Sequence, residues 1–139
     1  MMIVMRSRSF SLYVAATRAQ VWQALTEPAQ TRRFYFGLDV DSDWRLDEPI
    51  AYRVPGGPEW AGLHGDIVVL EPQRTLMHGI DESSWVTWQI DDAEPGVCRV
   101  ALTLDTLDPD DDAEETDEAW SRMMSGLKTV LETGRALRH

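Results

Sequence analysis

The chain has 139 residues, of which 43% are hydrophobic and 27% charged, and its formal net charge is −11. This length suits one domain spanning residues 1–139, and the composition excludes a disordered chain. Its apolar runs are shorter than the ~20 residues that cross a bilayer, and Arg6 and Arg8 follow the opening apolar residues too soon for a signal peptide. The single cysteine, Cys98, excludes an internal disulfide and cysteine-rich zinc sites. We therefore expect one cytoplasmic domain.

The negative charge is concentrated in one segment. Residues 105–118 contain nine acidic and no basic residues, whereas the rest of the chain has 15 acidic and 13 basic residues. A nearly neutral body with an acidic segment lacks the Lys/Arg surface that phosphate groups require. Nucleic acid and anionic membrane are therefore excluded as expected partners.

The first elements are a strand and two short helices. Residues 9–15 alternate and are rich in strand formers. Thr17 and Gln20 have the spacing of a capping box, so a helix should begin there and end before Pro28. Proline suits the first turn of a helix, so a second short helix is predicted from Pro28 to about Tyr35.

Six further strands follow, separated by turn signals such as Glu71-Pro72 and Glu94-Pro95-Gly96. They are predicted at 38–44, 49–54, 64–70, 75–80, 85–90 and 97–104. Successive strands joined by short turns should form an antiparallel meander with one apolar face to cover.

The clearest element is a long amphipathic helix at 114–136. Its apolar residues recur at three- and four-residue steps. They are Trp120, Met123, Met124, Leu127, Val130 and Leu131. The helix and the sheet each have one apolar face that must be covered. The order of the predicted elements therefore indicates an α+β helix-grip fold, in which a curved antiparallel sheet of six to seven strands wraps on this helix.

Several stretches carry a resemblance to a known family. They are 16–26 (ATRAQVWQALT), 43–53 (DWRLDEPIAYR), 65–72 (GDIVVLEP), 86–88 (VTW), 97–104, Trp120 and 127–132 (LKTVLE). In this order they resemble the START-related helix-grip (SRPBCC) superfamily, in the branch homologous to the activator of the heat-shock-protein ATPase (AHSA-type domain). The resemblance covers about residues 8–136 and implies a cavity between the C-terminal helix and the sheet.

Two positions depart from the family pattern. Phe34 or Tyr35 stands where the family usually has a tryptophan, and Asp47 stands where it usually has a glycine in a turn. An aspartate can adopt the left-handed backbone conformation at some cost. Neither departure threatens the predicted fold.

The chain lacks recognised catalytic and metal-binding motifs. Its histidines are His64, His78 and His139, too few and too dispersed for a three-histidine site. The acidic run 108–112 is similar to a calcium loop, but Ala113 and Ala119 replace its glycine and its bidentate glutamate. We therefore predict no metal, no cofactor and no assigned catalytic residue. His64 is predicted to be structural or solvent-facing, and His78 is either a general base or a hydrogen-bonded group in a cavity wall.

Six residues are predicted to bind a ligand. In-phase positions on the strands and on the C-terminal helix point them toward the expected cavity, where large rings and methionines shape an apolar pocket. They are Trp120, Trp88, Met124, Met123, His78 and Tyr52. The alternative for each of these six residues is an ordinary core role. For two further residues, Trp22 and Cys98, the core role is the preferred prediction.

Three functions are compatible with this sequence. The first is binding of a small hydrophobic or aromatic molecule, for which the Trp and Met lining argues. The second is a cyclase- or hydrolase-like enzyme in the same cavity, which would need a polar dyad, either His78 with Tyr52 or His78 with a carboxylate. The third is a chaperone-cofactor-like module that binds proteins. Binding of a small hydrophobic molecule by a monomer or homodimer is the preferred prediction.

Overall fold

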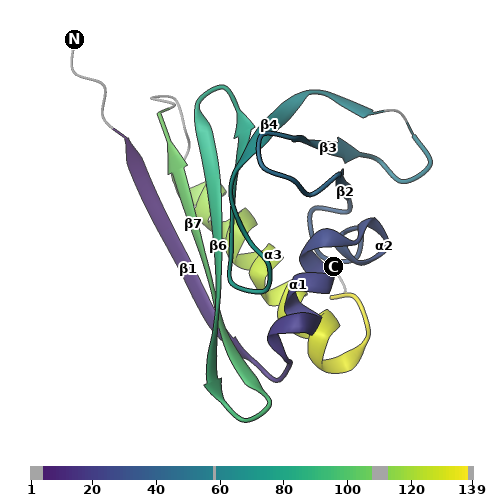
Figure 1. The fold of residues 1–139 in the computed structure, drawn as a ribbon, viewed down its shortest axis with the longest axis vertical. Coiled ribbons are helices and arrows are strands. Elements are labelled where there is room, and N and C mark those ends of the chain that lie inside the picture. The colour runs from purple at the N-terminus through teal and green to yellow at the C-terminus, as the bar shows by residue number, and fades with distance from the viewer. Residues whose placement is uncertain (1–4, 58, 108–112, 138–139) are drawn as a thin grey trace.

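The sheet is an antiparallel meander in the computed structural model, which describes residues 5–57, 59–107 and 113–137. Within these residues seven strands pair in the order β1-β7-β6-β5-β4-β3-β2. The strands are β1 (Arg6–Val14), β2 (Asp39–Ser42), β3 (Pro49–Arg53), β4 (Glu59–Glu71), β5 (Thr75–Asp81), β6 (Ser84–Glu94) and β7 (Val97–Thr106). The first strand pairs with the last, and the sheet curls into a half-barrel (Figure 1).

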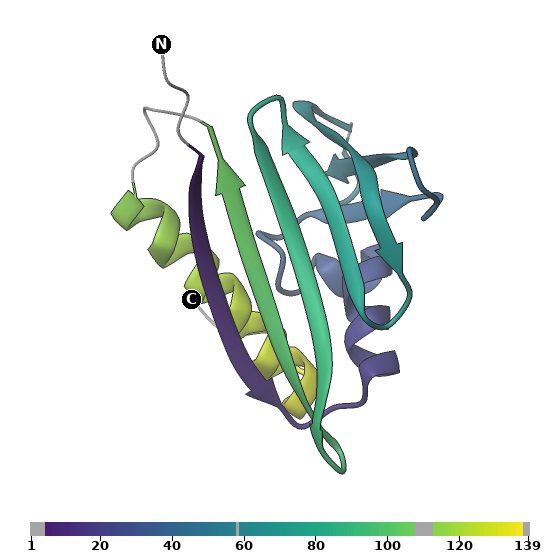
Figure 2. The ribbon, with the colours of Figure 1, turned by 60° about the vertical axis from the view of Figure 1, so that its left-hand side comes forward.

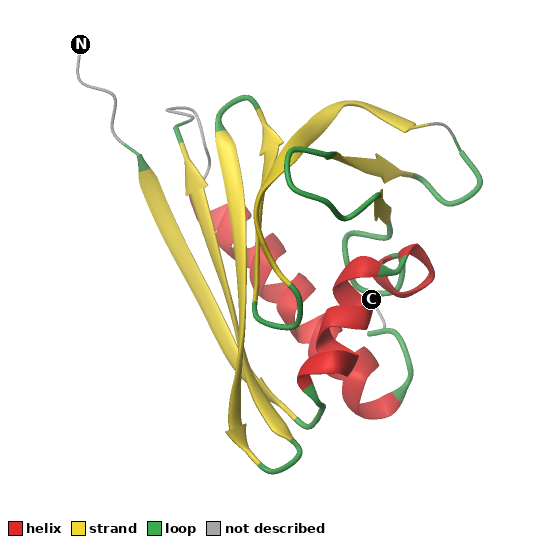
Figure 3. Ribbon diagram, in the orientation of Figure 1, coloured by secondary structure: helices red, strands yellow, loops and turns green. Residues whose placement is uncertain are grey.

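Three helices lie on the concave side of this sheet (Figure 3). They are α1 (Arg18–Thr26), α2 (Pro28–Thr31) and α3 (Ala113–Thr133). The predicted capping box is present, because the Thr17 hydroxyl accepts from the Gln20 amide and the Gln20 side chain accepts from the Thr17 amide. Two orphan donors at the start of α1 are satisfied in this way.

The helix α3 packs on the sheet as its apolar stripe predicts. Met124 and Leu127 are buried in one hydrophobic core with strand residues such as Trp88 and Leu102. Figure 2 shows α3 running behind β1 and β7. At the strand edge, the Lys128 ammonium donates to the Tyr13 carbonyl at 2.6 Å. The α+β helix-grip prediction is therefore confirmed.

The helix boundaries differ from the predicted ones at two places. The second short helix ends at Thr31 rather than near Tyr35. The long helix ends at Thr133 rather than at residue 136, because Gly134 takes a positive φ of 75° and its amide donates to the Val130 carbonyl at 2.8 Å. A left-handed glycine is a common helix terminator.

Two local features follow from backbone conformation. Asp47 has a φ of 67°, so it takes the left-handed conformation expected of a turn where the family usually has glycine. Gly65 on β4 lies so close to β5 that an added Cβ would come within 2.1 Å of the Gly79 carbonyl oxygen. Both positions therefore favour glycine, although only one of them has it.

The acidic run 108–112 and His139 lie outside the described residues, and so does the side chain of His64.

Candidate functional site

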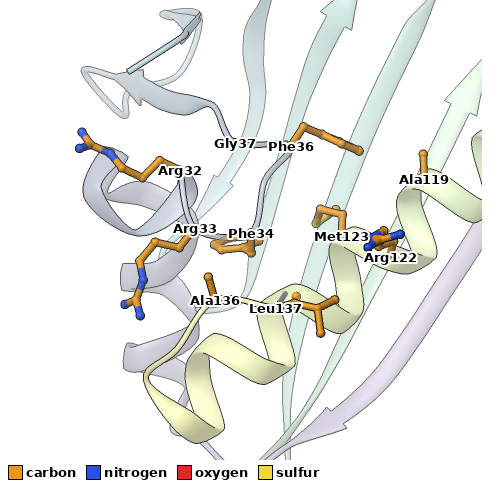
Figure 4. A pocket seen from close by; sticks show the side chains of 11 residues that line it. Arg32, Arg33, Phe34, Phe36, Gly37, Ala119, Arg122, Met123, Ala136 and Leu137 are labelled. Atoms are coloured by element: carbon orange, nitrogen blue, oxygen red, sulfur yellow. The ribbon is translucent and has the colours of Figure 1, made fainter. Parts of the chain in front are cut away.

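A cavity of about 530 Å³ opens beside α3. Its walls come from α3, from the segment 32–37 between α2 and β2, and from residues 136 and 137 that follow α3 (Figure 4). The lining residues are Arg32, Arg33, Phe34, Phe36, Gly37, Ala119, Arg122, Met123, Gly126, Ala136 and Leu137. Most of the lining groups are apolar, so the cavity suits an apolar molecule.

The buried hydroxyl of Thr31 holds the segment 32–37 in place. This hydroxyl donates to the Leu38 carbonyl at 3.0 Å and accepts from the Val40 amide at 2.9 Å. The chain between these anchors then leaves the helical path, because Phe36 and Gly37 have φ values of 52° and 71°. A positive φ is unusual for a bulky side chain such as phenylalanine. This backbone conformation directs the Phe36 ring toward the cavity, and Phe36 remains 45% exposed.

The wall from α3 is one stripe of the helix. Ala119, Arg122, Met123 and Gly126 are separated by three- and four-residue steps, which place them on the same face. An added Cβ at Gly126 would lie 3.4 Å from the Phe34 Cβ. A small residue at 126 therefore lets the segment 32–37 approach the helix.

Three arginines line this cavity, and two of them, Arg32 and Arg33, supply mainly their stems. The Arg32 guanidinium is paired with the Asp39 carboxylate at 2.8 and 3.0 Å. The Arg33 guanidinium donates to the Gly134 carbonyl. In Figure 4 both guanidinium groups turn away from Met123. The two aliphatic stems therefore add to the apolar lining. The two guanidinium groups make their interactions outside the cavity.

An aromatic cluster connects the cavity to the interior. The Phe36 and Trp120 rings are 5.2 Å apart and nearly perpendicular, and Trp120 makes a similar contact with Tyr35 at 6.1 Å. Tyr35 also contacts Phe36 at 5.4 Å and stacks on Tyr52 at 6.1 Å. Edge-to-face geometry at these separations is favourable for aromatic pairs. The cluster thus runs from an exposed ring to a fully buried one.

The two tyrosine hydroxyls at the inner end of this cluster are unusual. Tyr35 is 5% exposed and Tyr52 is 1% exposed, and neither hydroxyl has a hydrogen-bond partner among the residues that the structure describes. Burial raises the pKa of Tyr35 to about 12 and raises the pKa of Tyr52 well above its ordinary value. A weak hydrogen-bonding interaction between the two hydroxyls contributes to both pKa values, although their geometry falls short of a full hydrogen bond. Both phenols are therefore protonated at neutral pH.

His78 is buried on β5, with 2% of its surface exposed. Its Nδ1 lies 2.9 Å from the Gly79 carbonyl oxygen, and since a carbonyl only accepts, Nδ1 carries the proton. Burial lowers the pKa of His78 to about 4, so the ring is neutral at pH 7. The Tyr52 hydroxyl is unpartnered within the described chain. His78 and Tyr52 are therefore not hydrogen-bonded to each other in the described residues.

The six residues predicted to bind a ligand fall into two groups. Met123 lines the cavity, and Trp120 touches it through the Phe36 ring. The others are buried in the interior between the helix and the sheet. They are Trp88, Met124, His78 and Tyr52. Cys98 is buried like a small apolar residue, as expected, and Trp22 is partly buried against the core.

Sequence reasoning missed the residues that shape the opening of the cavity. Phe34, Phe36 and Leu137 were not among the predicted site residues, although they line it. The signal that was available is the run of three aromatic residues followed by Gly37. Such a run at the end of a short helix is too apolar for an ordinary exposed turn.

Two kinds of feature are absent from the described residues. Residues 5–57, 59–107 and 113–137 contain no group of three His, Cys, Asp or Glu side chains placed to hold a metal ion. In the same residues, no helix has the length and apolar character needed to cross a membrane.

Solved structures share this fold at low sequence identity. A conserved protein of unknown function from Enterococcus faecalis superposes with a TM-score of 0.79 at 15% identity, over 96% of this chain and 75% of that one. The solution structure of an Aha1 dimer from Colwellia psychrerythraea gives 0.76 at 17% identity, over 94% and 99% of the two chains. A protein from Cytophaga hutchinsonii gives 0.73 at 24% identity, over 94% and 96%. Identities this low establish a common fold alone.

The family comparison is more specific. No curated protein matches the chain. The family model described as Activator of Hsp90 ATPase homolog 1-like protein matches residues 15–132, which include both short helices, all but the last residue of α3 and every described strand except β1. This match supports a helix-grip domain of the general ligand- or protein-binding kind. The chain belongs to the Activator of Hsp90 ATPase homolog 1-like family.

Proposed function

We propose that this domain binds a small apolar or aromatic molecule in the cavity between α3 and the segment 32–37. The observation that carries the proposal is the cavity itself, whose volume of about 530 Å³ falls in the usual range for ligand pockets, roughly 300–1,000 Å³. Phe34, Phe36, Met123 and Leu137 supply an apolar lining. An apolar molecule would gain free energy by covering these groups.

The six predicted ligand residues lie at different distances from the proposed ligand. Met123 contacts the ligand directly, and its flexible thioether adapts to the ligand's shape. Trp120 supports the Phe36 ring at the edge of the cavity. Trp88, Met124, His78 and Tyr52 are buried in the interior and do not line the cavity. The ligand thus binds to one side of the interface between helix and sheet.

Tetralin, a bicyclic hydrocarbon without polar atoms, is a suitable probe. We would label the methionine methyl groups with ¹³C and titrate tetralin while recording their NMR signals. The Met123 methyl signal should shift in a saturable way, because this side chain lines the cavity. Met77 on β5 does not line the cavity, so its signal is the internal control. Tetralin should also raise the melting temperature, since a ligand that binds only the folded state stabilises it.

Two results would contradict the proposal. An unchanged Met123 signal at saturating tetralin would show that the cavity does not accept an apolar molecule. Equal shifts at Met123 and Met77 would indicate nonspecific association rather than binding at this site.

The family name supplies a second candidate, regulation of a heat-shock ATPase through protein contact. It rests on the match over residues 15–132. The test is the ATPase rate of purified Hsp90 with and without an excess of this domain. A saturable increase would support this role, and an unchanged rate would leave small-molecule binding as the better account.

A further inference from the structure

We infer that the hydroxyls of Tyr35 and Tyr52 form a buried polar subsite that binds a neutral oxygen atom, a ketone or hydroxyl, of the ligand. This inference rests on the proposed function, since the ligand reaches the subsite from the cavity beside α3. The occupant it specifies is an aromatic or alicyclic compound that has one such oxygen on an otherwise apolar skeleton.

The first observation is that both hydroxyls are buried without a hydrogen-bond partner among the described residues. Buried polar groups in native proteins are nearly always hydrogen-bonded, and each exception calls for an explanation. The two stacked rings, 6.1 Å apart, bring two such exceptions together. One ligand oxygen placed between the hydroxyls would satisfy both.

The second observation concerns charge. Both phenols are protonated at neutral pH and donate hydrogen bonds, so they favour an oxygen that accepts them. The carboxylate of Asp81 is close enough to contribute to the raised pKa of Tyr52. A ligand carboxylate would meet the same negative field and would lose its hydration in a buried site. The subsite therefore selects a neutral oxygen over an anionic one.

The third observation is the position of the subsite relative to the cavity. Phe36 lines the cavity and touches Tyr35, with ring centroids 5.4 Å apart, whereas Tyr35 itself does not line the cavity. Phe36 is also 45% exposed. An exposed ring can change rotamer without disturbing the core. Rotation of Phe36 is thus the step that connects the cavity with the hydroxyls.

The test compares 1-tetralone with tetralin, two compounds of similar shape that differ by the ketone oxygen. Their dissociation constants are measured by the Met123 methyl titration in the wild type and in Tyr35→Phe and Tyr52→Phe. The chain has three tyrosines, and the third, Tyr13, is 59% exposed on β1, so Tyr13→Phe is the matched control. ¹³C labelling of the tyrosine Cζ atoms reports each hydroxyl directly.

The wild type should bind tetralone more tightly than tetralin. The ratio of the tetralin dissociation constant to the tetralone dissociation constant should fall about 3- to 10-fold in Tyr35→Phe and Tyr52→Phe, as expected for loss of one net hydrogen bond. The ratio should not change in Tyr13→Phe. Tetralone, but not tetralin, should shift the Cζ signals of Tyr35 and Tyr52. Without ligand, Tyr52→Phe should melt at or above the wild-type temperature, because the hydroxyl that it removes is unpartnered.

The failures of the two proposals are distinguishable. If tetralin binds at Met123 and the tetralone ratio is the same in every variant, the subsite is refuted and the proposed function stands. If neither compound binds, both are refuted. A clearly lower melting temperature for ligand-free Tyr52→Phe would show that its hydroxyl already has a partner, such as a water molecule, and would overturn the subsite.

Discussion

Replacing His78 with asparagine tests how a buried imidazole links folding to pH. Asparagine keeps an N–H that can donate to the Gly79 carbonyl as Nδ1 of His78 does, but it does not titrate. The folded state holds the pKa of His78 at about 4, mainly through burial, against an ordinary value of 6.5. Between these pH values the unfolded chain binds a proton that the folded protein excludes.

The sign and size of the effect follow from this difference. Stability rises with pH wherever the unfolded state binds more protons, so the His78 contribution is complete above pH 6.5 and is lost as the pH falls toward 4. A pKa difference of this size corresponds to about 3 kcal/mol of unfolding free energy, with a slope of about 1.4 kcal/mol per pH unit inside the window.

Urea unfolding of both proteins from pH 4 to pH 7.5 measures the effect. The asparagine variant will be less stable at pH 7, because a smaller side chain leaves a cavity. Only the pH dependence is compared, so titration of the many exposed carboxylates cancels. The wild type should lose more stability than the variant on acidification from pH 6.5 to pH 4. Parallel curves in that interval would refute a neutral, buried His78.

Three substitutions and one matched control test local features of the fold and the site. Asp47→Gly should raise the free energy of unfolding by about 0.5–1 kcal/mol, because glycine takes the φ of 67° without strain; a lower urea midpoint would contradict this. Gly65→Ala should cost more than about 3 kcal/mol, since its Cβ would lie 2.1 Å from the Gly79 oxygen, whereas the matched Gly79→Ala, with its nearest contact at 3.2 Å, should cost less. Equal costs would be inconsistent with this packing. Trp120→Ala should weaken tetralin binding about tenfold. It should lower the free energy of unfolding by less than the ~3–5 kcal/mol that truncation of a core residue costs. A larger loss of stability with unchanged binding would make Trp120 a plain core residue.

The order of the elements was predictable because each has a local signal. The Thr17 and Gln20 pair specifies the start of α1, and the stripe from Trp120 to Leu131 specifies the buried face of α3. The end of α2 was not predictable in this way. It depends on the Thr31 hydroxyl, which donates to the Leu38 carbonyl and accepts from the Val40 amide, groups that meet only in the folded chain.

The site was less predictable than the fold. Alternation on a strand shows that Trp88 and Tyr52 point inward, but an inward side chain lines a cavity or fills the core depending on what packs opposite it. The cavity depends on the turn at Phe36 and Gly37 and on the close approach of Phe34 to Gly126. Phe34 and Gly126 are about ninety residues apart in the sequence, and no local pattern encodes their contact.

The most direct test of the proposed ligand site is the dissociation constant of tetralin in Ala119→Trp compared with Ser125→Trp. Ala119 lines the cavity from α3, whereas Ser125 is exposed on the same helix and does not line it. An indole at position 119 occupies the space proposed for the ligand, and the Ser125 variant controls for a bulky ring on the helix. We predict that tetralin binding is lost in Ala119→Trp and unchanged in Ser125→Trp. Wild-type affinity in a folded Ala119→Trp protein would show that tetralin binds elsewhere, and it would contradict the account.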